Sequence, residues 1–105
     1  MIDHARVSEL RAEVGSEDLA EVVQLFCEEV EETLDRIMSH PSPSLAEDLH
    51  FLKGSALNIG MTELGALCQS AERTLRADPA AQPDLPGIAT AFRKSRQALY
   101  LEIDD

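Results

Sequence analysis

The chain has 105 residues, of which 44% are hydrophobic and 4% aromatic, and its net charge is −11 at pH 7. This length is enough for one domain with its own core, and the aliphatic composition favours packed helices over a disordered chain. The negative charge argues against binding to nucleic acid or to anionic membranes, because both need a basic face. No apolar run approaches the roughly 20 residues that span a bilayer, and the first residues do not resemble a signal peptide, so we expect a cytoplasmic protein.

The first two helices are expected at residues 3–14 and 17–39. Asp3 can cap the first helix and Gly15 can end it. Ser16 can cap the second helix, which the proline-containing segment after it brings to an end. The apolar residues of the second helix recur on one side and should be buried: Val22, Val23, Phe26, Val30, Thr33, Leu34 and Ile37.

Three further helices are expected at residues 44–59, 62–77 and 85–103, with Gly60 as a left-handed cap after the first of them. Their inward positions should be Leu45, Leu49, Leu52, Ala56 and Ile59, then Leu64, Leu67, Cys68, Ala71 and Leu75, then Ile88, Phe92, Leu99 and Ile103. Four long amphipathic helices with short connections predict an all-α fold. Its architecture should be an antiparallel up-down four-helix bundle with a short additional N-terminal helix, all in a single domain over residues 1–105.

The cysteines and two of the histidines are interpreted as structural. Cys27 and Cys68 lie in different helices without metal-ligand spacing, so we expect reduced, buried thiols. His4 lies in a first helical turn and has no evident partner, and His40 follows the end of the second helix, where a cation is favoured. Since these two histidines and His50 share no helical face, no metal site is expected.

His50 lies on a helical face that packing alone does not explain. On that helix His50, Lys53, Gly54 and Leu57 are three or four residues apart, with Glu47 one turn earlier. They therefore form a line beside the apolar residues that are expected to face the core. A glycine inside a helix costs roughly 1 kcal/mol relative to alanine, which is tolerated where another body comes close. Either a neighbouring helix or a docking partner could require that approach, and the exposed histidine beside it favours a partner.

The run around this histidine resembles the core motif of histidine-containing phosphotransfer (HPt) domains of two-component phosphorelays. The run reads His50-Phe51-Leu52-Lys53-Gly54-Ser55-Ala56 and is followed by Asn58-Ile59-Gly60. The Glu17–Ile37 helix and the Leu64–Cys68 segment also resemble the family, so the similarity covers nearly the whole chain. The resemblance implies that His50 is phosphorylated and that Lys53 stabilises the charge of the phosphoryl group.

A turn about residue 60 would place His50 level with residues near 71 on the next helix. Glu72 and Gln69 are the polar residues at that level, and the resemblance implies that one of them orients the imidazole by accepting a hydrogen bond from its Nδ1–H, with Glu72 the first candidate. The partner-docking residues implied by the same comparison are Gly54, Leu57, Glu47 and Arg76.

The expected function is therefore a phosphocarrier without a kinase or ATP site of its own, passing a phosphoryl group on His50 between receiver-domain aspartates. The expected partners are response-regulator receiver domains, with a hybrid sensor histidine kinase as a further candidate, and the chain is expected to be a monomer. No cofactor is expected, since magnesium would be supplied by the partner receiver domain. The alternative is a non-phosphorylatable helical-bundle adaptor that binds receiver or kinase domains. A hydrolase is disfavoured, because no serine or cysteine nucleophile pairs with His50.

Overall fold

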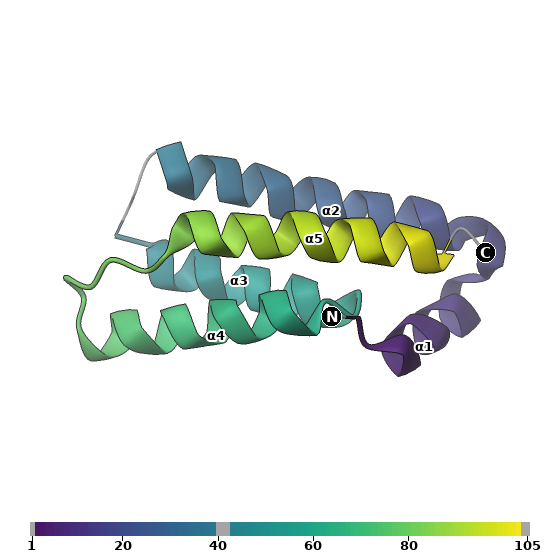
Figure 1. The fold of residues 1–105 in the computed structure, drawn as a ribbon, viewed down its shortest axis with the longest axis horizontal. Coiled ribbons are helices and arrows are strands. Elements are labelled where there is room, and N and C mark those ends of the chain that lie inside the picture. Colours follow the sequence, from purple (N-terminus) through teal and green to yellow (C-terminus); the bar gives the residue numbers. More distant parts are fainter. Residues whose placement is uncertain (1, 40–42, 104–105) are drawn as a thin grey trace.

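The computed structural model describes residues 2–39 and 43–103, which form an elongated helical bundle of 44 × 22 × 20 Å (Figure 1). Its five helices are α1 (His4–Val14), α2 (Ser16–Ser39), α3 (Leu45–Asn58), α4 (Thr62–Ala77) and α5 (Leu85–Ile103). Each bound lies within one residue of the range expected from the sequence. No strand occurs among the described residues, although an isolated bridge joins Ile2 to Met61. His40 lies outside this described part of the chain.

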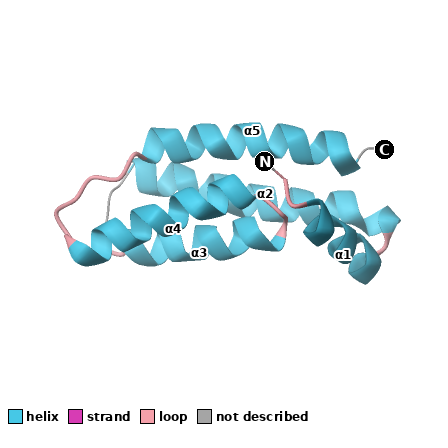
Figure 2. Cartoon of the chain, turned by 60° about the horizontal axis from the view of Figure 1, so that its bottom comes forward, coloured by secondary structure: helices cyan, strands magenta, loops and turns pink. Residues whose placement is uncertain are grey.

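The four long helices pack in a ring. Helix α3 contacts α2 and α4, and α5 contacts both α2 and α4 and so closes the bundle. Figures 1 and 2 show α1 as a short arm at one end, where it packs against α2. This is the expected four-helix bundle with an extra N-terminal helix. In the described ranges, no helix combines the length and apolarity needed to cross a bilayer.

The core contains most of the positions expected from helical periodicity. Leu49, Leu52, Ala56 and Ile59 of α3 and the following segment are fully buried, as are Leu64, Cys68 and Leu99 on the neighbouring helices. Leu67 was expected to be buried, but that prediction is wrong, because 39% of the residue is exposed. It borders a groove between α4 and α5 whose other wall includes Gly87, and a glycine provides no side chain to cover it.

The two cysteines are free and buried, as expected. Burial raises the pKa of the Cys27 thiol to about 11, against the opposing charge of Arg96, and burial alone raises the pKa of the Cys68 thiol to about 12. Both thiols are therefore protonated at neutral pH and poorly nucleophilic.

The N-terminal caps differ in part from those expected. Asp3 caps α1 by accepting a hydrogen bond of 3.2 Å from the backbone N–H of Arg6. Ser16 does not cap α2, because it is already the first helical residue and Gly15, at φ 87°, precedes the helix.

His4 was expected to lack a partner, but its Nδ1 contacts the Glu102 carboxylate at the end of α5.

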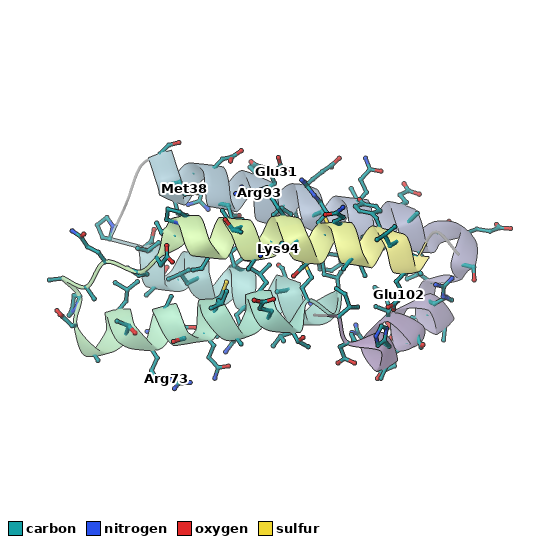
Figure 3. All side chains as sticks on the ribbon, viewed as in Figure 1. Glu31, Met38, Arg73, Arg93, Lys94 and Glu102 are labelled. Atoms are coloured by element: carbon teal, nitrogen blue, oxygen red, sulfur yellow. The ribbon has the colours of Figure 1, made fainter. Side chains whose placement is uncertain are left out.

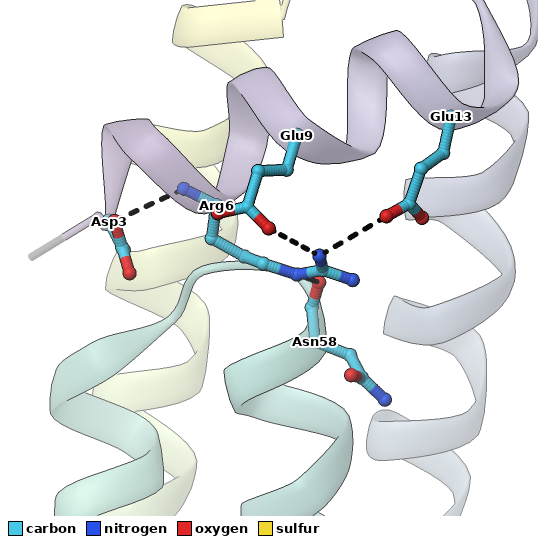
Figure 4. A network of polar contacts seen from close by, with 5 residues as sticks. All are labelled: Asp3, Arg6, Glu9, Glu13 and Asn58. Carbon is cyan, nitrogen blue, oxygen red and sulfur yellow. Dashed lines mark hydrogen bonds and ion pairs between the residues drawn. The ribbon is translucent and has the colours of Figure 1, made fainter.

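Arg6 fastens α1 to the C-terminal end of α3 (Figure 4). Its Nε donates a hydrogen bond of 2.9 Å to the carbonyl oxygen of Asn58. Its Nη1 lies 3.3 Å from a Glu9 carboxylate oxygen and 3.7 Å from one of Glu13. The guanidinium thus satisfies one of the carbonyl groups that a helix leaves without an internal partner at its end, where positive charge is favoured.

The turn between α3 and α4 is a Schellman motif centred on Gly60. The N–H of Gly60 donates to the carbonyl of Leu57 at 3.2 Å, and the N–H of Met61 donates to the carbonyl of Ala56 at 2.8 Å. Gly60 adopts the left-handed φ of 79° that this motif requires, and Met61 is fully buried. The turn therefore fixes the register in which α4 runs back along α3.

Substituting Gly60 by alanine should lower the free energy of unfolding by about 1–2 kcal/mol, because a Cβ is disfavoured at left-handed φ. The added methyl would also lie 3.1 Å from the carbonyl oxygen of Asp3 and 3.3 Å from a Val7 methyl. Urea unfolding measures the change. The matched control is Gly54→Ala, whose methyl would meet nothing within 4 Å. This substitution should raise the free energy of unfolding by about 0.5–1 kcal/mol, because alanine favours a helix more than glycine does. Equal stability of the two variants would contradict the structural role of Gly60.

Candidate functional site

His50 lies in the second turn of α3 and faces away from the core. Its side chain is 63% exposed, whereas Leu49 and Leu52 on the same helix are fully buried. The amphipathic pattern of α3 explains this difference, since the leucines occupy the buried stripe and leave the imidazole beside it. His50 is therefore accessible to another molecule.

Glu72 of α4 contacts the imidazole from the facing helix. The His50 Nδ1 and the Glu72 Oε1 are 3.2 Å apart, and only 11% of the Glu72 side chain is exposed. An ionised carboxylate can only accept hydrogen bonds, so Nδ1 carries the proton and Nε2 of the neutral ring keeps its lone pair. Of the two residues expected at this level, Glu72 makes the contact, whereas Gln69 is exposed.

Arg76, one turn further along α4, engages the other oxygen of the same carboxylate. Its Nε and Nη2 lie 3.0 Å and 2.9 Å from the Glu72 Oε2. Arg76 was expected to contact a partner, and its side chain is 59% exposed, but its guanidinium is already paired within the chain. The sequence carried a signal for this pair, since Glu72 and Arg76 are four residues apart on one helix.

The two partners of Glu72 determine its charge. Burial alone would raise the pKa of this carboxyl group, but the hydrogen bonds from Arg76 and His50, together with their charges, outweigh burial and lower it below its ordinary value. Glu72 is therefore ionised at neutral pH, as its role as an acceptor from both neighbours requires.

Lys53 and Gly54 follow His50 on α3. Lys53 is half-buried, and within residues 2–39 and 43–103 it has no ion-pair partner. Gly54 is exposed, and a Cβ added to it would meet nothing within 4 Å. Close packing of a neighbouring helix therefore does not explain this glycine.

Two apolar side chains on the same helix as His50 are partly exposed. Leu57 is 47% exposed and Phe51 is 44% exposed, and Glu47 is an exposed residue one turn before His50. Leu57 lies over Gly65 of α4, where a Cβ would be only 2.8 Å from its Cδ2. Gly65 was not among the expected site residues, and its lack of a side chain gives Leu57 its place beside α4.

The ion pair of Arg36 with Asp48 holds the start of α3 against α2. The two terminal nitrogens of Arg36 lie 3.0 Å and 3.3 Å from the two carboxylate oxygens of Asp48. This forked geometry restrains both side chains two residues before His50. In the described part of the chain, no three histidine, cysteine, aspartate or glutamate side chains gather closely enough to hold a metal ion.

Glu72→Gln should make the protein less stable than the wild type at neutral pH by about 1 kcal/mol, because a charged hydrogen-bond acceptor is lost. The folded-state pKa of Glu72 lies below its unfolded-state value, so on acidification the unfolded chain takes up this proton first. The advantage of the wild type should therefore shrink as the pH falls from about 6 to about 3.

Urea unfolding at several pH values measures this difference. The control is Glu32→Gln on α2, which removes an equal charge from an exposed position. A Glu72→Gln difference that stays constant over the whole pH range would contradict the proposed charge state of Glu72.

Comparison with known proteins gives one family for this arrangement. Residues 21–102 match the Hpt domain family, which is more than half of the chain. Neither a search of curated proteins nor a search of solved structures gave a match. The matched region covers α3 and α4, most of α2 and almost all of α5, whereas α1 lies before it.

Hpt domains are helical bundles that act in histidine phosphotransfer in two-component signalling. They are phosphocarriers and not kinases, and they interact with receiver domains and kinases. The helical bundle and the family match agree with the resemblance first seen in the run that begins at His50. The chain belongs to the Hpt domain family.

Proposed function

We propose that this chain carries a phosphoryl group on Nε2 of His50 and passes it between the aspartates of receiver domains. The observation that carries this proposal is the contact between a buried carboxylate and an exposed imidazole. Glu72 occupies Nδ1 at 3.2 Å, while 63% of the His50 side chain remains open to solvent. Nε2 then keeps a free lone pair, and it is the ring nitrogen that a partner can reach.

In the proposed step the lone pair of Nε2 attacks the phosphorus of an aspartyl phosphate. A nitrogen–phosphorus bond forms as the phosphorus–oxygen bond breaks, and the electron pair of that bond stays on the aspartate as carboxylate. No proton needs to move, because Nδ1 keeps its hydrogen. The reverse sequence at a second receiver returns the phosphoryl group to an aspartate and restores the neutral imidazole.

The charges around His50 suit this reaction, which depends mainly on positioning and on charge stabilisation. The ring becomes cationic once Nε2 bears phosphorus and Nδ1 keeps its proton, and the carboxylate of Glu72 lies next to that charge. Lys53, without an ion-pair partner in the described residues, can approach the phosphoryl oxygens. Any magnesium ion would be held by the acidic residues of the receiver.

The proposed docking surface consists of Glu47, Phe51, Gly54 and Leu57 around the histidine. The open space above Gly54 lets the receiver backbone come near α3, while the exposed parts of Phe51 and Leu57 can be covered by apolar side chains. A hydrophobic centre with a polar rim is typical of protein interfaces.

The experiment that tests the function incubates the chain with a panel of phosphorylated receiver domains and compares the wild type with His50→Gln. The wild type should gain an acid-labile, base-stable phosphoryl group, because phosphohistidine has that stability pattern, and the variant should gain none. The unfolding free energy of His50→Gln should change by less than about 1 kcal/mol, since the replaced side chain is mostly exposed. A folded wild type that accepts phosphate from no receiver would favour the adaptor alternative.

Gly54→Gln tests the docking surface. The longer side chain should slow transfer from a receiver by about 10- to 100-fold, because small displacements of reacting groups have large effects on rate. Phosphoramidate, a small donor that needs no docking surface, should phosphorylate this variant at the wild-type rate. An unchanged rate from the receiver would remove Gly54 from the interface, and a slower rate with both donors would indicate damage to His50 itself.

A further inference from the structure

We propose that Arg76 is a positioning residue for phosphoryl transfer, acting on His50 through Glu72. This inference rests on the proposed function, since it concerns the reactivity of the same imidazole. It assigns Arg76 a role inside the site, in place of the partner contact expected from the sequence. The three side chains are connected in succession, because Arg76 contacts one oxygen of Glu72 and His50 contacts the other.

The guanidinium of Arg76 restricts how the carboxylate of Glu72 can rotate. The Nε and Nη2 of Arg76 converge on Oε2 of Glu72, at 3.0 Å and 2.9 Å, so only Oε1 is left to face His50. The terminal torsion of a glutamate is broad, and without a second partner the carboxylate could rotate. Because Arg76 is four residues along the same helix, its position relative to Glu72 is set by the helical backbone. The guanidinium therefore fixes the plane of the carboxylate that holds the imidazole.

The charge of Glu72 also determines which nitrogen of His50 carries the hydrogen. An ionised Glu72 can only accept, which forces the imidazole to place its hydrogen on Nδ1. A protonated Glu72 could instead donate to Nδ1, and the ring hydrogen would then lie on Nε2, whose lone pair would be lost to the reaction. Glu72 is nearly buried, so its charged form depends on compensation by neighbours. The guanidinium of Arg76 remains charged at all relevant pH values and supplies that compensation without taking part in proton exchange.

A direct contact of Arg76 with the phosphoryl group or with the receiver would be a different role. The two roles predict different dependence on Glu72. If Arg76 acts through Glu72, its removal should have no further effect once Glu72 has been replaced by a neutral residue. A direct contact would retain its effect in that background, so a double-mutant cycle separates the two roles.

The first test records the side-chain nitrogen signals of His50 by NMR at neutral pH in wild type, Arg76→Ala and Arg73→Ala. Arg73 is the matched control, because it is an exposed arginine of α4 that points away from the bundle in Figure 3. In the neutral ring, the wild type and Arg73→Ala should carry the hydrogen on Nδ1. Arg76→Ala should lose the predominance of that tautomer. An unchanged spectrum in Arg76→Ala would overturn the proposal.

The second test measures phosphorylation of the same proteins by phosphoramidate, which donates its phosphoryl group to Nε2 as the phosphorus–nitrogen bond breaks and ammonia leaves. Phosphoramidate needs no docking surface, so its rate reports on the imidazole alone. Arg76→Ala should be about tenfold slower than wild type because Glu72 is no longer held in place, while Arg73→Ala should keep the wild-type rate. Arg76→Lys should recover part of the loss, because it restores the charge but not the fork of donors. An unchanged Arg76→Ala rate would contradict a positioning role.

The third test is the double-mutant cycle of Glu72 and Arg76. Glu72→Gln alone should be slow, and Glu72→Gln combined with Arg76→Ala should be no slower. A further loss in the double variant would assign Arg76 a direct contact and overturn the inference. Failure of the proposed function is recognised separately, because in that case the wild type itself would accept no phosphoryl group from any receiver.

Discussion

The ionised carboxylate of Glu72, nearly buried between two helices, is the interaction on which the site depends. A charge in such a position needs partners for both of its oxygens, and the chain supplies one from each side, His50 across the helix interface and Arg76 along the same helix. The requirement to satisfy this carboxylate explains why a mostly exposed histidine has a defined orientation. Under the proposed function, that orientation leaves Nε2 open to a partner.

The fold provides the conditions for this contact. The Schellman turn at Gly60 sets the register of α3 against α4, and fully buried Leu52 and Leu64 on these helices help to keep them together. The network of Arg6 holds α1 against the end of α3. Glycine serves different purposes at two places on this pair of helices. Gly65 admits the side chain of Leu57, whereas Gly54 leaves its surroundings open.

Helix bounds were predictable to within one residue because apolar periodicity, prolines and the glycines at positions 15 and 60 mark the same ends. The level of Glu72 opposite His50 was also predictable, since it follows from the position of the turn and the rise of a helix. Contacts that depend on the packing of several helices were not predictable. The pairing of His4 with Glu102 and the forked pair of Arg36 with Asp48 join segments distant in sequence, and their charges alone offered many other combinations.

The orientation that Glu72 gives to the imidazole is measured most directly by the site of the phosphorus on the histidine ring. Phosphorylated, nitrogen-15-labelled wild-type protein would be studied by NMR through the couplings between phosphorus and the ring nitrogens. The contact with Glu72 predicts phosphorus on Nε2 of His50 and a retained hydrogen on Nδ1. Phosphorus on Nδ1, or on a different residue, would contradict the account.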